Sequence, residues 1–369
     1  SNEKYEKKVI TFDSSKIGYS FDGEIVDIKS PVKNNLIGKV SNFIKRVFVV
    51  RKLKKEIDIT ISLLSGPNLL NILSKRNDKV IVSVRNYLSR SSSGLYGALH
   101  KLLIRFTYNR ADLIIAVSES IKEDLINNFG IRKDKIKVIY NFYDIDYIES
   151  LASEEISQEY MEIFDNPSVV TAGRLSYQKG HWYLLRAFKR VKKEIPNAQL
   201  IILGEGKLKE KLKMLAKELN ILESVHFLGF KNNPFKYIAK ADIYAFPSLF
   251  EGFPNALCEA MVCGLPILST DCKSGPREIL YSDATGTNYS ITKVTFADYG
   301  VLIPVFDGKL YGSRESFTRE EELLANAITH MLNNKEILYK YKYLSKKRVK
   351  DFHVDFILPK WEEAINSLL

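Results

Sequence analysis

The chain of 369 residues is longer than one ordinary hydrophobic core can organise, so its length predicts two lobes of roughly 150 to 200 residues each. A content of 45% hydrophobic and 27% charged residues is typical of a folded protein, and the apolar runs are too short to cross a bilayer. The three cysteines, Cys258, Cys263 and Cys272, lack CxxC spacing and neighbouring histidines. These features argue against a membrane-spanning chain, a metal cluster and a disulfide framework, and they favour a reducing, cytoplasmic setting.

A strongly basic segment follows the first two predicted strands, which lie at residues 8–12 and 23–27. Residues 29–55 contain nine lysines and arginines and no acidic residue, and residues 1–150 contain 26 basic against 17 acidic residues. The apolar residues of this segment recur at helical spacing: Ile37, Val40, Phe43, Ile44, Val47, Val50 and Leu53. The pattern predicts a basic amphipathic helix. Such a helix either packs on the core with a solvated cationic face or lies on an anionic membrane surface.

Short apolar runs then alternate with longer helical patterns in both halves of the chain. From DITISLL to KIKVIYN, and again from SVVTAG to GVLIPV, this alternation predicts parallel sheets that are doubly wound by helices. The rhythm breaks at residues 141–157, which we expect to form the hinge between the two lobes.

A pair of cations follows the first strand of the second half. In GRLSYQKG, Arg174 and Lys179 lie five positions apart in a glycine-bounded loop. Ligands of doubly wound sheets bind beyond the carboxyl ends of the strands, so this loop is placed to contact a ligand. A guanidinium fork and an ammonium can together neutralise a departing diphosphate and so replace a divalent metal. Without the neighbouring motifs, these two residues would be read as ordinary surface cations.

Two glycine-containing turns end the next two predicted strands. Residues 204–206 (GEG) lack the third glycine of a dinucleotide fingerprint, so they predict a tight strand-to-helix turn near the ligand. Residues 229–231 (GFK) end the run VHFLG and could place backbone groups against the edge of a base.

The segment EGFPNALCE contains two carboxylates eight residues apart, Glu251 and Glu259. Between them, Gly252 permits close backbone approach, and Pro254 suits the first turn of a helix, whose free N–H groups can meet an anionic or hydroxyl-rich ligand. Asn255 lies four residues before Glu259 and therefore shares its helix face. Ionised carboxylates accept hydrogen bonds from ribose or sugar hydroxyls, so we expect the pair to orient one ligand.

Other interpretations compete with a diphosphate ligand. Paired carboxylates also occur in glycoside hydrolases, but Arg174 and Lys179 favour an anionic leaving group. The DID at residues 144–146 resembles a metal-binding motif, yet it falls in the expected hinge, and the five histidines do not cluster. Arg85 and Asn86, at a strand end of the first half, either bind an acceptor or cap the next helix.

The series GRLSYQKG, LGEG, FLGF, EGFPNALCE and CGLPILSTDCKSGPREIL resembles, in this order, the retaining glycosyltransferases of family 4 with the GT-B fold. The match covers nearly the whole second half, and the first half agrees more loosely through DITISLLSGPNLL, VIVSVRN, RADLIIAVSESIKEDL and KIKVIYN. The resemblance implies two Rossmann-like lobes, residues 1–147 and 148–352, that face each other across a cleft. It also implies a closing helix in residues 353–369 that packs back on the first lobe.

The resemblance assigns roles to single residues. Arg174 and Lys179 would bind the diphosphate and, together with Glu251, act in catalysis, while Glu259 would bind the ribose hydroxyls. The donor site would consist of Gly173, Arg174, Lys179, Phe230, Lys231, Glu251, Gly252, Phe253, Pro254, Asn255 and Glu259, with Phe230 and Lys231 beside the base. The first lobe would hold the acceptor, and no metal or other cofactor would be needed.

Two departures from the family pattern concern the first lobe. The strand and glycine-rich loop that open the family have no counterpart before Lys8, so we expect an N-terminal unit to be missing from this sequence. Arg85 and Asn86 stand where the family often has a histidine.

The predicted function is retaining, metal-independent transfer of a hexose or N-acetylhexosamine from a nucleotide-diphosphate sugar, with UDP favoured over GDP. The expected acceptor is a saccharide or lipid-linked saccharide in cell-surface polysaccharide synthesis. We expect a cytoplasmic protein, peripheral on the inner face of the membrane through residues 29–55. The alternative is a non-catalytic sugar-nucleotide-binding protein or partner subunit. Nucleic acid is not an expected partner, because the sequence has the charge for it but no recognisable motif.

Overall fold

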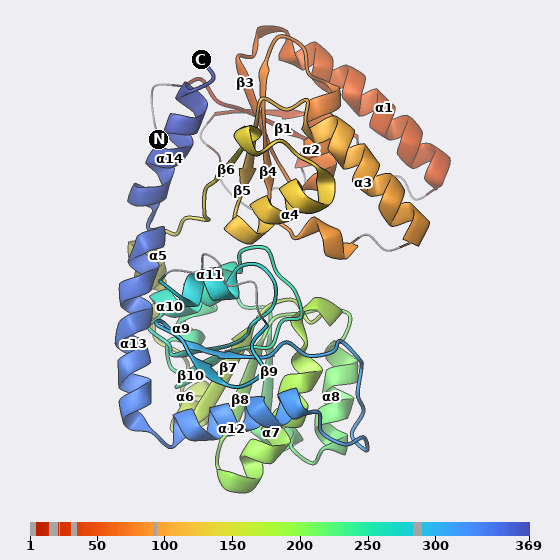
Figure 1. The fold of residues 1–369 in the computed structure, drawn as a ribbon. Helices are drawn as coiled ribbons and strands as arrows, with labels where there is room; N and C mark the ends of the chain where they lie inside the picture. The colour runs from red at the N-terminus through yellow and green to blue at the C-terminus, as the bar shows by residue number, and fades with distance from the viewer. Residues whose placement is uncertain (1–4, 15–20, 22, 31–34, 92–93, 283–289) are drawn as a thin grey trace.

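The chain forms two α/β lobes in the computed structural model, which describes residues 5–14, 21, 23–30, 35–91, 94–282 and 290–369 (Figure 1). The first lobe is built from the red-to-yellow part of the chain and the second from the green-to-blue part, and the last helices run along one side of both lobes. The predicted fold class, two lobes with parallel sheets, is confirmed.

The first lobe contains two parallel sheets. β1 (Lys8–Thr11) pairs with β2 (Glu24–Asp27), and β3 (Ile59–Leu63), β4 (Lys79–Val84), β5 (Leu113–Ala116) and β6 (Ile136–Val138) pair in this order. The helices of this lobe are α1 (Leu36–Leu53), α2 (Ser65–Leu73), α3 (Gly94–Tyr108) and α4 (Glu119–Phe129). Parallel neighbours need crossover connections, and α2, α3 and α4 supply them along one side of the larger sheet (Figure 1).

Alternation along β4 separates the two faces of the first-lobe sheet. Val80 and Val82 join the core under the crossover helices, whereas Ile81 joins a smaller core with Ile357 and Ala364. The last two residues belong to α14 (Val354–Asn366), so the closing helix covers the opposite face of the first-lobe sheet. Its predicted return to the first lobe is confirmed.

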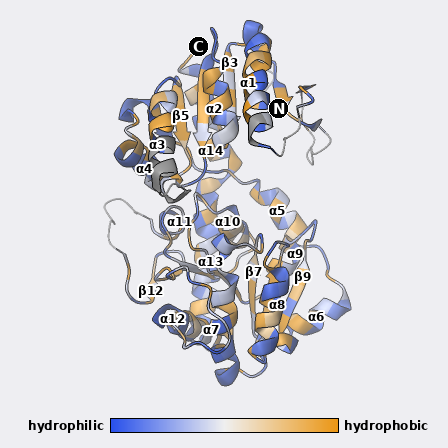
Figure 2. Cartoon of the chain, turned by 90° about the vertical axis from the view of Figure 1, so that its right-hand side faces the viewer, coloured by the Kyte–Doolittle hydropathy of each residue, from blue (hydrophilic) through white to orange (hydrophobic). Residues whose placement is uncertain are grey.

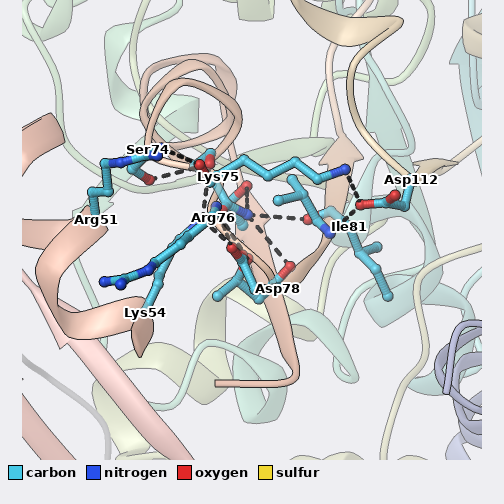
Figure 3. Close-up of polar contacts among 12 residues, drawn as sticks. Arg51, Lys54, Ser74, Lys75, Arg76, Asp78, Ile81 and Asp112 are labelled. Atoms are coloured by element: carbon cyan, nitrogen blue, oxygen red, sulfur yellow. Dashed lines mark hydrogen bonds and ion pairs between the residues drawn. The ribbon is translucent and has the colours of Figure 1, made fainter. Parts of the chain in front are cut away.

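A buried ion pair lies at the amino end of β4, away from the carboxyl ends of the strands (Figure 3). Lys54 Nζ is 2.9 Å from Asp78 Oδ2, and it also donates to the backbone and side-chain oxygens of Asn71. Burial alone would raise the pKa of Asp78, but hydrogen bonds from Thr60, the Arg76 backbone N–H and Lys54 outweigh burial and lower it. The pair fixes the C-terminal end of α1 to the start of the sheet.

The second lobe is a mainly parallel sheet in the order β12-β13-β11-β10-β7-β8-β9, in which only the β12–β13 pairing is antiparallel among the described strands. Its strands are β7 (Ser168–Ala172), β8 (Gln199–Leu203), β9 (Val225–Gly229), β10 (Ile243–Phe246), β11 (Ile267–Thr270), β12 (Thr295–Phe296) and β13 (Val301–Ile303). Its helices are α5 (Ile145–Ala152), α6 (Gln158–Phe164), α7 (His181–Glu194), α8 (Lys209–Glu218), α9 (Phe235–Ile238), α10 (Asn255–Val262), α11 (Pro276–Leu280), α12 (Arg319–Leu332) and α13 (Lys335–Val349). The strand order reverses between β7 and β10, so this doubly wound sheet has its switch point there.

The two lobes share one hydrophobic core. The core under the first-lobe helices continues without a break into residues of β10, α10 and α11 in the second lobe. Rings from the connecting segments complete the contact: the centroids of Tyr140 and Phe253 are 5.1 Å apart, and those of Phe253 and Phe352 are 5.3 Å apart. The lobes therefore pack against each other in this structure.

The connection between the lobes contains more helix than the sequence pattern suggested. Asp144 caps α5 through a 3.0 Å hydrogen bond from the Tyr147 N–H, so the DID segment starts a helix. α5 packs on α9 and α10, which places residue 147, the expected lobe boundary, inside a second-lobe helix. The returning chain crosses beside it, where Tyr143 and His353 form a parallel bridge.

The predicted basic helix is present as α1, but its apolar residues do not all face the core. Val50 is buried, whereas Val40, Ile44 and Phe48 are 54, 51 and 68% exposed. Residues 31–34 and the side chain of Ile37 lie outside the described part of the structure. The outer face of α1 therefore carries apolar as well as cationic side chains, and α1 is not a core-packed helix with a purely cationic outer face.

Candidate functional site

The predicted donor residues gather where the second-lobe strand order reverses. β7 and β10 are neighbours, and their carboxyl ends lead into the loops that contain Lys179 and Glu251. The turns after β7, β8 and β9 are joined by backbone hydrogen bonds, from the Gly173 N–H to the Leu203 carbonyl and from the Gly204 N–H to the Gly229 carbonyl. A switch point is where doubly wound sheets bind ligands, so the motifs share one edge.

The GEG turn needs glycine for packing. A Cβ atom on Gly204 would lie 2.0 Å from the Gly173 carbonyl oxygen, and one on Gly206 would lie 2.3 Å from the Leu175 carbonyl oxygen. The two strand-end loops can therefore touch only because these side chains are absent. This agrees with the predicted tight strand-to-helix turn.

An ion pair joins the two central loops. Lys179 Nζ lies 2.8 Å from Glu251 Oε1, and it also lies 4.7 Å from the centre of the Phe246 ring. Both side chains are largely buried, at 17 and 9% exposure. A desolvated pair of this kind is held firmly, so Lys179 presents a fixed positive charge at the strand ends.

Arg174 and Glu259, the other two charged residues predicted for the donor site, differ in their exposure to solvent. Arg174 is exposed, and among the described residues no carboxylate lies within ion-pair distance of it. Glu259 is half-buried, and burial raises the pKa of its carboxyl group while the Lys179 charge opposes this shift. The site therefore offers one fixed cation, one free cation and one partly desolvated carboxyl group.

The glycine of EGFPNALCE faces the first lobe, and its asparagine faces the segment that connects the two lobes. A Cβ on Gly252 would lie 1.9 Å from the Arg85 carbonyl oxygen, so the backbones of the two lobes touch there. Asn255 Oδ1 accepts hydrogen bonds from Asn141 Nδ2 at 2.7 Å and from the Tyr143 hydroxyl at 3.0 Å. Phe253 and Pro254 are buried behind this contact.

The predicted base-flanking residues lie on one side of this edge. Phe230 is 74% exposed, as a side chain that stacks on a ligand would be. Lys231 is held by Tyr160, whose hydroxyl accepts its hydrogen bond at 3.2 Å, and this bond raises the pKa of Lys231. Nζ of Lys231 also lies over the rings of Tyr160 and Tyr237.

Arg85 and Asn86 do not start the next α-helix, and their role in binding an acceptor stays a prediction. Their backbone packs on Gly252, and the next α-helix, α3, does not start until Gly94. Burial lowers the pKa of Arg85, which the nearby Tyr143 hydroxyl opposes. The structure thus places them at the junction of the lobes, beside the predicted donor-sugar loop.

Sequence reasoning missed two residues at this edge. His181, the first residue of α7, is buried, and its Nδ1 has no hydrogen-bond partner among the described residues. Burial, aided by the Lys179 charge, lowers the pKa of His181 to about 3, so the ring is neutral. Tyr244 bonds through its hydroxyl to the backbone of Ala172. Only proximity to Lys179 in GRLSYQKGH could have singled out His181.

Chemically, this edge suits an anionic, hydroxyl-bearing ligand. Two cations and free backbone groups can meet phosphates, and the carboxylates can accept from hydroxyls. Within the described ranges, no three histidine, cysteine, aspartate or glutamate side chains are grouped so as to hold a metal ion.

Comparison with protein families matches both lobes. The model described as "Glycosyltransferase Family 4" matches residues 5–147, and the one described as "Glycosyl transferases group 1" matches residues 153–294. An uncharacterized glycosyltransferase of Methanocaldococcus jannaschii is 33% identical over 99% of this chain and 93% of its own length. A Campylobacter jejuni enzyme, N-acetylgalactosamine-N,N'-diacetylbacillosaminyl-diphospho-undecaprenol 4-alpha-N-acetylgalactosaminyltransferase, is 32% identical over 88% of each chain.

Solved structures share the fold. Sucrose-phosphate synthase from Thermosynechococcus elongatus superimposes with a TM-score of 0.75 at 15% identity, covering 98% of this chain and 88% of that one. Anabaena Alr3699/HepE in complex with UDP superimposes with a TM-score of 0.69 at 20% identity, covering 94 and 86%. Because two family models together span most of the chain and near full-length relatives exceed 30% identity, the chain belongs to the family 4 glycosyltransferases and has the GT-B fold.

Proposed function

We propose that this glycosyltransferase moves a hexose or N-acetylhexosamine from a UDP-sugar to a saccharide or lipid-linked saccharide, with retention of configuration and without a metal. The observation that carries the proposal is the buried Lys179–Glu251 pair at the switch point, beside the free Arg174. A leaving diphosphate needs positive charge when its bond to the sugar breaks, and these two cations supply it where ligands of such sheets bind.

The proposed reaction needs no protein nucleophile. The acceptor hydroxyl oxygen forms a bond to the anomeric carbon on the face that the diphosphate leaves, and the bond from that carbon to the phosphate oxygen breaks. The electron pair of the broken bond stays on UDP, and a phosphate oxygen takes the proton of the acceptor hydroxyl. Arg174 and Lys179 stabilise the charge on UDP, and Glu251 orients Lys179 and the sugar hydroxyls.

Two relatives support the substrate classes. The Anabaena structure that shares this fold contains UDP, and the name of the Campylobacter enzyme describes transfer to a diphospho-undecaprenol-linked saccharide. The exposed Phe230 beside Lys231 offers a ring on which a uracil base can stack, and the carboxylate of Glu259 suits the ribose hydroxyls. We place the acceptor on the first lobe, next to Arg85 and Asn86.

We also propose that the outer face of the first lobe contacts an anionic membrane, on its cytoplasmic side. Exposed apolar residues occur on α1 (Val40, Ile44 and Phe48) and on α3 (Leu102, Leu103 and Phe106). Both helices lie on the same side of the sheet, and the hydropathy view shows mixed apolar and polar residues along each of them (Figures 1 and 2). No helix in the described part is long and apolar enough to cross a bilayer.

The enzymatic proposal is tested by incubating the full-length protein with a panel of UDP- and GDP-sugars and lipid-linked saccharides. Mass spectrometry should find a product one sugar heavier with a UDP-sugar, and NMR should find the donor's anomeric configuration in it. UDP binding without transfer to any acceptor would favour the alternative, a sugar-nucleotide-binding or partner subunit. A product of inverted configuration would contradict the proposed mechanism.

Substitution of Glu251 separates catalysis from binding. Glu251→Gln keeps the shape of the side chain but removes the charge that holds Lys179, so we expect turnover to fall about 100-fold or more. Calorimetry should find UDP affinity within about threefold of the parent protein, because Lys179 keeps its charge and Glu251 is predicted to contact the sugar rather than UDP. Glu210→Gln, an exposed residue of α8, is the matched control and should behave like the parent.

Membrane contact is tested separately by flotation with vesicles of anionic or neutral lipid. Lys45, Lys52 and Lys55 are exposed, whereas Lys54 is buried in its ion pair and must be kept. Changing the three exposed lysines to glutamine should weaken binding to anionic vesicles, since each is worth about 1 kcal/mol near such a surface. The same change at the exposed second-lobe residues Lys193, Lys211 and Lys217 should have no effect. Equal flotation of both variants would refute this surface.

A further inference from the structure

A carboxylate of the second lobe binds the start of a first-lobe helix. Glu278 of α11 is only 7% exposed, and its Oε2 accepts from the Glu119 N–H at 2.8 Å. Its Oε1 accepts from the Ser120 N–H at 3.0 Å and from the Ser120 hydroxyl at 2.8 Å. Glu119 and Ser120 are the first residues of α4, whose free N–H groups and dipole favour a negative charge. The contact joins residues about 158 positions apart in the chain.

A second contact beside it links the same helix to the predicted donor-sugar loop. The Ser274 hydroxyl donates to the Gly252 carbonyl oxygen at 2.5 Å and lies 2.7 Å from the hydroxyl of Ser118, the cap of α4. Because Ser274 has one hydroxyl hydrogen and gives it to Gly252, Ser118 must donate to Ser274. The chain of bonds runs from α4 of the first lobe to the backbone of EGFPN in the second.

Both sides of this contact are held in place. Ser274 has a φ of 68°, a left-handed conformation that costs a non-glycine residue of order 1 kcal/mol and persists when its surroundings require it. Arg348 of α13 donates to the carbonyl oxygens of Glu278, Ile279 and Tyr281, which fixes α11 to the second lobe. On the first lobe, Lys122 pairs with Glu119 at 2.9 Å and limits the repulsion between Glu119 and Glu278.

We propose that Glu278, with Ser274, is a positioning residue that latches the two lobes together and sets the donor-sugar loop against the acceptor lobe. The catalytic part of this proposal rests on the proposed function; the latch itself does not. In the latched structure Gly252 lies against Arg85, so the backbones of the two lobes touch beside the strand ends. Closure of this kind keeps an activated sugar from being lost to water.

The energetics suit a contact that opens and closes. The charge-assisted hydrogen bonds stabilise the latched state, but burial opposes them and raises the pKa of Glu278. The net stabilisation is therefore smaller than the number of bonds suggests, as substrate entry and product release require.

Cross-linking measures the latch without any catalysis. In the full-length Ser118→Cys, Ser274→Cys protein, the new thiols replace hydroxyl oxygens that lie 2.7 Å apart, so a disulfide joins the lobes when they are latched. We expect oxidation to form this disulfide, seen as a shifted band on a non-reducing gel. Adding Glu278→Gln should slow its formation at least tenfold, whereas Glu322→Gln, on the far helix α12, should not. Equal rates with and without Glu278 would overturn the proposal.

Kinetics and scattering provide independent readouts on proteins with native serines. Glu278→Gln and Glu278→Ala should lower the rate of transfer, the second more strongly, and raise the fraction of UDP released by hydrolysis without acceptor. UDP affinity should stay within about threefold, because Glu278 lies outside the predicted nucleotide contacts. Small-angle X-ray scattering should find a larger radius of gyration for Glu278→Ala. An unchanged radius of gyration together with an unchanged ratio of hydrolysis to transfer would contradict the latch. This outcome does not depend on which sugar donor the enzyme uses.

Discussion

At the switch point, the sequence predicted which residues lie together but not which of them form an ion pair. The sequence predicted that Arg174, Lys179, Glu251 and Glu259 lie at one edge of the sheet, because a doubly wound pattern places strand-end motifs there. It did not predict that Lys179 pairs with Glu251, because the two residues are 72 positions apart and no sequence periodicity relates them. The assigned roles of these residues in binding and catalysis stay predictions until ligands are tested.

Gly252 contacts the first lobe, and its motif alone did not predict this contact. The motif predicted close backbone approach to a ligand, whereas the structure places the Arg85 carbonyl oxygen where a Cβ would stand. Gly252→Ala should push the lobes apart and lower the rate of transfer at least tenfold, with UDP affinity little changed. Gly66→Ala in α2, where a Cβ meets nothing within 4 Å, is the control. Full activity of Gly252→Ala would show that this contact is not needed.

His181 predicts a specific dependence of stability on pH. Its pKa is about 3 in the folded protein, against 6.5 for a free histidine, so the unfolded chain binds the proton more tightly. The free energy of unfolding should therefore fall as the pH drops from 6.5 toward 3, by up to about 1.4 kcal/mol per pH unit from this group. Urea unfolding between pH 7 and 4 should give a shallower loss for His181→Leu. Identical slopes would mean that His181 is protonated in the folded state.

At the scale of elements, sequence periodicity predicted the helices and strands, but it did not predict which of their residues face solvent. The apolar spacing of residues 36–53 predicted α1 correctly, yet spacing alone could not tell which side would meet the core. Lys54 shows the limit most clearly. It belongs to a run of four basic residues in five positions, which reads as solvated charge, but it is 1% exposed and paired with Asp78.

The Lys54–Asp78 pair should stabilise the junction of α1 and the first-lobe sheet. Asp78→Asn leaves a buried ammonium without its counter-charge, which typically costs about 3 to 5 kcal/mol. Denaturant unfolding should detect this loss in the full-length protein. Asp134→Asn, which breaks the exposed pair with Arg132, should change stability far less, because solvent screens both charges. Similar effects of the two substitutions would show that the Lys54 pair is not desolvated as the structure indicates.

At the scale of the whole molecule, the sequence predicted two lobes and a returning helix, and both are confirmed. It did not predict how the lobes meet, because contacts such as Glu278 to α4 join residues far apart in the chain. The segment SGPREIL belongs to the series of family motifs, but the sequence predicts no role for its glutamate. Its position across the interface is a property of the assembled lobes and of neither lobe alone.

A crystal structure of the full-length protein with UDP would show whether the second-lobe switch point binds a UDP-sugar. We expect the diphosphate against Arg174 and Lys179, the ribose hydroxyls on Glu259 and the base beside Phe230. UDP bound elsewhere, or a diphosphate out of reach of both cations, would contradict this expectation.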